Sequence, residues 1–97
     1  KKAKTKLEDS FRIITNDKTH VVVKPFVVTK SIVNKNVQTL IRMKIRESFK
    51  IIAEKRGFSQ MVQDLIMYSI QRELRNELKK ITPLASLEIR WFKRLKA

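Results

Sequence analysis

The stretch HVVVKPFVV at residues 20–28 decides the character of the fold, because five of these residues are valines. Branched side chains such as valine favour extended strands, in which successive side chains point to opposite faces. One face would then carry Val21, Val23 and Val27, and the other Val22, Lys24 and Phe26. Pro25 has no N–H to donate to a neighbouring strand, which predicts that this stretch lies at a sheet edge or at a bulge.

The residues before this strand predict its hairpin partner. Phe11, Ile13 and Thr15 alternate with Arg12 and Ile14, and residues 16–18 (NDK) then supply a turn. The chain opens on a lysine-rich segment with no large apolar side chain in its first six residues. We therefore expect a flexible basic arm over residues 1–8, followed by a single domain over residues 9–97.

After the strand, the spacing of apolar residues changes from two to between three and four. Val37, Ile41, Ile45, Phe49 and Ile52 fall on one face of an α-helix, which Asn34 or Asn36 would cap and Gly57 would end. We expect Ser59 to cap a second helix, with Pro83 marking the exit from it. Its predicted buried stripe consists of Val62, Leu65, Ile66, Ser69, Ile70, Leu74, Leu78 and Ile81.

The last stretch, residues 84–95, alternates like a strand. Leu87, Ile89 and Trp91 would share one face, and Glu88, Arg90 and Phe92 the other. The expected order is therefore ββααβ, an α+β fold in which a small three-stranded sheet packs against two helices.

The charge of the chain limits the classes of partner that it is expected to bind. Twenty-three Lys and Arg oppose nine Asp and Glu, which gives a net charge of +14, and the isoelectric point is about 10.6. Such an excess attracts polyanions, of which nucleic acid and anionic membranes are the main classes. Membrane binding is the weaker interpretation, because no apolar run approaches the roughly 20 residues of a span and the apolar helix faces are needed for packing. The absence of cysteine fits a reducing compartment.

The basic residues are unevenly distributed along the chain. The predicted second helix is nearly neutral, whereas the arm, the first helix and the last strand are basic. Arg42, Arg46 and Lys50 are spaced by four, which predicts a cationic ridge along a phosphate backbone; the alternative is an ordinary solvated helix face. Our candidate RNA-binding residues are Lys1, Lys2, Lys4, Lys6, Lys24, Arg42, Arg46, Lys50, Arg90, Lys93, Arg94 and Lys96.

Two aromatic residues lie among the cations of the last strand. We expect Trp91 to belong to the core, because it falls in the apolar set. Phe92 would lie on the opposite face, where it either stacks on an unpaired base or is partly covered by a neighbouring protein or segment.

Catalytic machinery is not visible in the sequence, and we expect no enzyme and no catalytic, cofactor or metal-binding residues. His20 is the single histidine and has no candidate nucleophile or further ligand nearby. Glu73 and Glu77 are interpreted as surface charges, with Lys80 near Glu77. Three classes of function can be compared: a structural RNA-binding protein, a DNA-binding or chromatin-type module, and an enzyme acting on RNA. The third class would need an acid–base pair or metal-binding carboxylates, and the sequence offers neither. The near-neutral second helix argues against the second class, because a recognition helix needs cations and base-reading side chains.

Several segments together carry a family resemblance. Residues 7–11 (LEDSF), 22–25 (VVKP), 58–65 (FSQMVQDL), 77–84 (ELKKITPL) and 87–90 (LEIR) follow one another as they do in the C-terminal half of the S3Ae family of archaeal and eukaryotic small-subunit ribosomal proteins. The sequence looks closer to archaeal than to eukaryotic members. It departs from the family pattern at Thr19-His20, at Thr82 and at Trp91-Phe92, where a polar, basic pair is common.

The resemblance implies a structural constituent of the small ribosomal subunit, located in the cytoplasm. The implied partners are small-subunit rRNA, neighbouring ribosomal proteins and messenger RNA near its exit site, with no membrane, cofactor or small-molecule substrate. The alternative is a basic nucleic-acid-binding module outside the ribosome.

Overall fold

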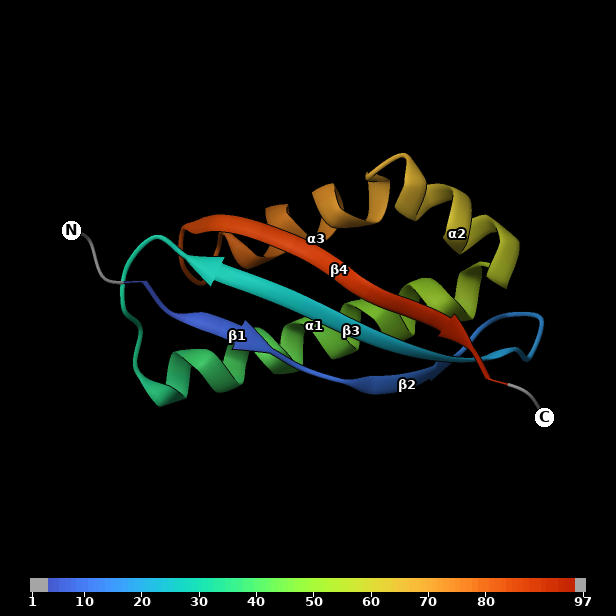
Figure 1. Cartoon of the computed structure of the whole chain (residues 1–97), viewed down its shortest axis with the longest axis horizontal. Coiled ribbons are helices and arrows are strands. Elements are labelled where there is room, and N and C mark those ends of the chain that lie inside the picture. Colours follow the sequence, from blue (N-terminus) through green and yellow to red (C-terminus); the bar gives the residue numbers. More distant parts are fainter. Residues whose placement is uncertain (1–3, 96–97) are drawn as a thin grey trace.

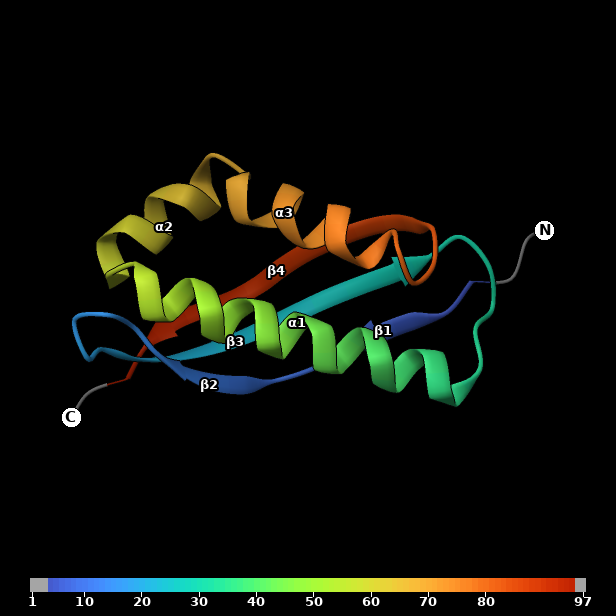
Figure 2. The ribbon, with the colours of Figure 1, turned by 180° about the vertical axis from the view of Figure 1, so that it is seen from behind.

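The computed structural model describes residues 4–95, which form a sheet covered on one face by helices (Figures 1 and 2). This two-layer arrangement confirms the predicted α+β class. The elements follow one another as β1 (Lys6–Glu8), β2 (Phe11–Ile14), β3 (His20–Thr29), α1 (Lys35–Lys55), α2 (Phe58–Ile66), α3 (Ser69–Leu78) and β4 (Leu84–Arg94). The predicted order ββααβ lacked β1 and joined α2 to α3.

Strand β3 is the centre of the sheet. β4 runs antiparallel along one side of it, and β1 and β2 share the other side, also antiparallel (Figure 1). β1 corrects the expected arm over residues 1–8, because Lys6, Leu7 and Glu8 pair with the end of β3 and the Leu7 side chain is buried. The candidate residues Lys1, Lys2 and Lys96 lie outside the described residues.

Pro25 lies where the sheet is interrupted on both sides. The backbone N–H of Asp9, between β1 and β2, donates to the Pro25 carbonyl over 3.3 Å, and the register of β4 shifts between Lys24 and Pro25. Of the two predicted places for this proline, the bulge is therefore correct and the edge is wrong. The alternation along β3 is as expected, since Val21, Val23 and Val27 are buried.

Helix α1 follows its predicted pattern closely. The Asn34 side chain caps it by accepting a hydrogen bond from the N–H of Val37 over 2.9 Å. Ile41, Ile45 and Phe49 are buried as expected, and the buried set continues to Ala53. None of the helices within residues 4–95 is long and apolar enough to cross a membrane.

The predicted second helix is wrong in one respect, because it is two helices. Met67 and Tyr68 separate α2 from α3, and Tyr68 has a left-handed backbone with φ of 61°. The break changes the phase of the apolar stripe between the two parts. Ile66 is consequently 72% exposed rather than buried, and Met61 enters the core in its place.

Gly57 follows the end of α1, as predicted, whereas Ser59 does not cap the next helix. Gly57 has an ordinary φ of −80° and occupies the cap position of α2, and Ser59 lies inside that helix. The cap is supplied by the β2–β3 turn, where the Asp17 carboxylate accepts from the Phe58 N–H over 3.3 Å. A Cβ on Gly57 would lie 3.2 Å from that carboxylate, so a larger residue here would require the Asp17 side chain to shift.

Candidate nucleic-acid interface

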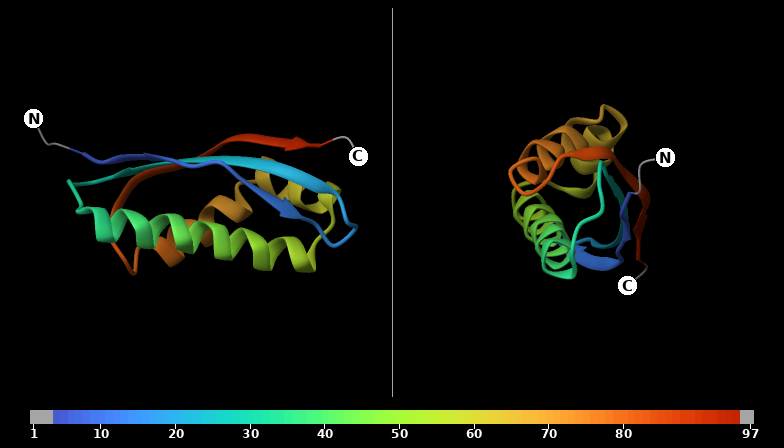
Figure 3. Two further views of the ribbon diagram at one scale, coloured as in Figure 1. Left: turned by 90° about the horizontal axis from the view of Figure 1, so that it is seen from below. Right: turned by 90° about the vertical axis from the view of Figure 1, so that its left-hand side faces the viewer.

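The face of the sheet opposite the helices is open to solvent and carries four of the nine candidate cations that lie within residues 4–95. Figure 3 shows the helices on one side of the sheet only. Strand register places the partners of the outward residues Val22, Lys24, Phe26 and Val28 on this same outer face. Its cations are Lys6, Arg12, Lys24, Arg90 and Lys93, and its carboxylates are Glu8 and Glu88.

The structure reverses the predicted faces of Trp91 and Phe92. In β4, Ile89 pairs with Pro25 and Trp91 with Lys24, which leaves Arg90 as the extra residue of a bulge. An extra residue moves every following side chain to the opposite face. Trp91 therefore points outward and is 46% exposed, whereas Phe92 packs against the core. The prediction of Trp91 as a core residue is wrong.

Trp91 lies among lysines on the outer face. The Nζ atom of Lys24, on the neighbouring strand, is 5.6 Å from the centre of the indole. The Nζ atom of Lys93, two residues further along β4, is 5.8 Å from it. Both distances are within the range of cation–π attraction, so the lysine side chains are held near the ring while their charges face solvent.

Arg90 is partly engaged within the protein. Its guanidinium carbon lies 4.0 Å from the centre of the Phe26 ring, and its Nε is 3.5 Å from a Glu88 carboxylate oxygen. Phe26 is thereby covered on the outer face. Arg90 contributes charge to this face, but its side chain is less available than those of Lys24 and Lys93.

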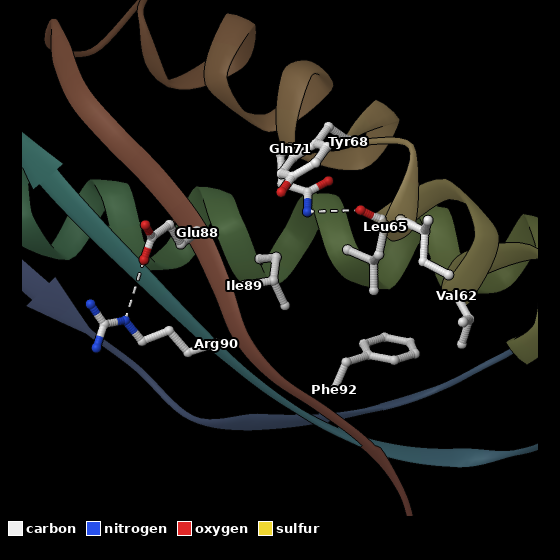
Figure 4. Close-up of a pocket in the computed structure, with 9 residues that line it drawn as sticks. Val62, Leu65, Tyr68, Gln71, Glu88, Ile89, Arg90 and Phe92 are labelled. Atoms are coloured by element: carbon white, nitrogen blue, oxygen red, sulfur yellow. Dashed lines mark hydrogen bonds and ion pairs between the residues drawn. The ribbon is translucent and has the colours of Figure 1, made fainter.

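Phe92 lines a pocket on the helical side of β4 (Figure 4). Its ring stacks on Phe58 with 5.6 Å between centres, and the pocket is completed by side chains such as Val62 and Leu65 of α2 and Gln71 of α3. Phe92 is therefore partly covered by a segment of its own chain, as in the second of its two predicted alternatives, but on the face opposite to the predicted one. Arg94 lies on this side too, 5.8 Å from the Phe58 ring, so it does not extend the outer face.

The predicted ridge on α1 is interrupted by an internal ion pair. The Nε and Nη2 atoms of Arg46 each donate to a carboxylate oxygen of Asp9 over 2.8 Å. These hydrogen bonds lower the pKa of Asp9, against the opposing effect of its partial burial. Arg42 is half-buried and Lys50 is exposed beside this pair. The charge of Arg46 is therefore largely compensated, and the ridge presents fewer free cations than its spacing suggested.

Two cations that we did not select join the ridge to the outer face. Arg12 lies on β2 at the sheet edge, and Lys18 lies in the β2–β3 turn; with Arg46 and Lys50 they line an open groove between β2 and α1. Alternation with buried Ile13 could have identified Arg12 as outward-facing. Lys4 is exposed immediately before β1.

The two glutamates of α3 form ion pairs within the helical layer. Glu73 contacts Arg56 over 3.5 Å, and Glu77 contacts Lys44 over 3.6 Å and Lys80 over 3.5 Å. His20 is exposed at the start of β3, opposite Ile14. Within residues 4–95, no three His, Asp or Glu side chains gather as a metal site would require.

Comparison with known proteins identifies a family. The model of the Ribosomal S3Ae family matches residues 1–97. Small ribosomal subunit protein eS1 of Nanoarchaeum equitans is 33% identical over 87 residues, which cover 90% of this chain and 44% of that protein. Small ribosomal subunit protein eS1 of Sulfolobus acidocaldarius is 35% identical over 85 residues, covering 88% and 43% respectively. The chain thus spans less than half the length of these relatives.

Proposed function

The chain belongs to the Ribosomal S3Ae family, and we propose that it is a structural component of the small ribosomal subunit that binds rRNA through the outer face of its sheet. In this role it acts without catalysis, and its place is the ribosome in the cytoplasm. Neighbouring small-subunit proteins are its further partners, with messenger RNA where the site lies near the exit path.

The difference in charge balance between the outer face of the sheet and the helices α2 and α3 carries this proposal. Seven of the described outer-face side chains are charged, and five of these are cations. In α2 and α3, by contrast, three carboxylates accompany two arginines, and Asp64 and Glu77 also pair with Arg56 and Lys44. Phosphate contacts supply much of the affinity of nucleic-acid-binding proteins, so the face with an excess of cations is better suited to rRNA than the surface of α2 and α3.

The ridge on α1 extends this surface around the sheet edge. Arg12 on β2 lies between the outer face and the groove that Lys50 lines. A phosphate backbone could therefore pass from the outer face over the edge to α1 without leaving a line of cations. Arg46 contributes to the shape of this path through its pair with Asp9 more than through free charge.

Charge reversal on each layer tests the proposal. Arg12→Glu with Lys24→Glu changes the outer face by four charge units, and Lys30→Glu with Arg72→Glu makes the same change at exposed positions of the β3–α1 connection and α3. Binding to a transcript of small-subunit rRNA would be measured for both pairs, with circular dichroism to verify folding. We expect the outer-face pair to weaken binding at least tenfold more than the control pair, which corresponds to about 1.4 kcal/mol. Equal losses would contradict a specific rRNA-binding face.

A further inference from the structure

We propose that Trp91 is a stacking platform for an unpaired base of single-stranded RNA, with Lys24 and Lys93 contacting the adjacent phosphates. This inference rests on the proposed rRNA-binding function and adds to it a specific site and ligand. The site lies at the end of β4, after the bulge at Arg90 that reverses which side chains face outward.

The bulge determines that the indole is exposed. Regular alternation after Ile89 would have placed Trp91 in the core and Phe92 outside. The extra residue instead gives the core position to Phe92 and presents the largest aromatic side chain of the chain to solvent. Bulges that redirect a side chain are common beside binding sites.

The surroundings of the indole match the chemistry of a nucleotide. A base offers a flat aromatic face that stacks on an indole, while its phosphates need cations a few ångströms away. Lys24 and Lys93 approach the ring at 5.6 and 5.8 Å, and their flexible stems allow the ammonium groups to move from the ring to a phosphate. Arg12 lies on the same outer face and can contact the next phosphate along the strand.

The charge of the patch favours RNA over a protein segment as its occupant. Around Trp91, the outer-face neighbours include the cations Lys24 and Lys93 and the half-buried Val22, which pairs with both Lys93 and Arg12. Beyond Lys24 on the same face lies Phe26, with the Arg90 guanidinium over its ring. A covering protein segment would have to desolvate these cations or bring carboxylates to pair with them. An RNA strand supplies both the aromatic partner and the negative charge. The stacked base must be unpaired, because the bases of a duplex already stack on one another.

The single tryptophan of the chain makes the site directly observable. Tryptophan emission would be followed while the chain is titrated with an oligoadenylate of about eight nucleotides, a length within the usual range of single-strand sites. Inorganic polyphosphate serves as a polyanion without bases. We expect quenching and a blue shift with the oligonucleotide and little change with polyphosphate.

Substitution separates stacking from charge. Trp91→Ala should weaken oligoadenylate binding about 5- to 100-fold, the usual cost of losing one base–aromatic stack, and leave polyphosphate binding unchanged. Trp91→Phe should retain part of the affinity. Tyr68→Ala is the matched control, because Tyr68 is an aromatic residue that is 67% exposed on the helical layer; it should leave both affinities unchanged.

Each other outcome overturns the proposal in a recognisable way. If Trp91→Ala binds oligoadenylate like the parent while rRNA still binds, the indole does not stack on a base, and only the stacking inference fails. If Trp91→Ala weakens both ligands equally, the effect on binding is electrostatic or structural, and stacking is again excluded. If the parent binds neither rRNA nor oligoadenylate, the proposed function itself fails.

Discussion

Single residues show how an internal contact can remove a cation from a predicted surface. Arg46 falls in the i, i+4 row of Arg42 and Lys50, and nothing in that spacing distinguishes it from them. Asp9, which lies 37 positions earlier in the chain, accepts two hydrogen bonds from its guanidinium. Because a bidentate pair is held in a fixed geometry, it stabilises the junction between β1, β2 and α1 more than an ordinary surface ion pair would.

Reversal of Arg46 should therefore cost stability that reversal of Lys50 does not. In Arg46→Glu, a carboxylate replaces the partner of Asp9, so the pair is lost and repulsion replaces it. We expect the free energy of unfolding to fall by about 1–2 kcal/mol, and by no more than about 0.5 kcal/mol for the exposed Lys50→Glu. Urea denaturation of both variants beside the parent measures this difference. Equal midpoints would mean that the Asp9–Arg46 pair does not form in solution.

The same pair predicts a dependence of stability on pH. The hydrogen bonds from Arg46 depress the pKa of Asp9, so the folded protein holds this carboxylate ionised more strongly than the unfolded chain does. The resulting stabilisation is present above the unfolded pKa of about 4 and is lost as the pH falls through the lower folded pKa.

Asp9→Asn isolates this contribution from that of Asp17, whose pKa is lowered by hydrogen bonds from Thr15 and Thr19. Melting temperatures of the parent and of Asp9→Asn would be compared from pH 6 downward, because carboxylates become protonated in this range. We expect the variant to be less stable at pH 6 and the two curves to converge at acid pH. A constant gap across this range would contradict the assignment.

At the scale of whole elements, the helix break between α2 and α3 gives a test of the buried face. Ile66 and Ile70 are four residues apart and were expected to share one stripe. The left-handed Tyr68 lies between them, and Ile66 is 72% exposed whereas Ile70 is fully buried.

Truncation of these two isoleucines should therefore have unequal effects. Ile70→Ala leaves a cavity in the core and should lower the free energy of unfolding by about 2–5 kcal/mol. Ile66→Ala removes an exposed side chain and should change it by less than about 0.5 kcal/mol. Thermal or urea denaturation distinguishes the two cases, because a continuous helix through residues 59–81 would make both substitutions destabilising.

Local sequence patterns predicted the elements that depend on local rules. The four-residue spacing in α1, its Asn34 cap and the alternation along β3 all appear in the structure as expected. Each of these features requires only a single element with one buried face. The fold class followed from them.

The incorrect predictions arise where a distant partner determines the outcome. The bulge at Arg90 forms against Pro25, which lies 65 positions earlier. The spacing of apolar residues within residues 84–95 therefore could not predict it. Strand β1 forms because the end of β3 is available to pair with it, although its own sequence is short and charged. For the same reason, the candidate cations could be selected from the sequence, but their division between two faces could not.

On the scale of the whole molecule, net charge and its position have different consequences. A charge of +14 attracts any polyanion, and composition alone predicts that much. The structure adds that five cations share the outer face of the sheet, with Arg42 and Lys50 around the edge, while carboxylates balance the cations within α2 and α3. A molecule with this layout should release counterions mainly from one side when it binds RNA.

The salt dependence of rRNA binding measures how many of these cations contact phosphate. For about four to eight contacts at about 0.7–0.9 each, log affinity should fall against log salt with a slope of roughly −3 to −7. Neutralising Arg12 and Lys24 to Gln should make this slope shallower by about 1.4–1.8, because two contacts are removed. Neutralising Lys30 and Arg72 to Gln should leave the slope unchanged, although the net charge falls by the same amount. If both pairs of substitutions make the slope shallower by the same amount, attraction is spread over the whole surface and the outer face has no special role. A slope near zero for the parent protein would exclude phosphate contacts as the basis of binding.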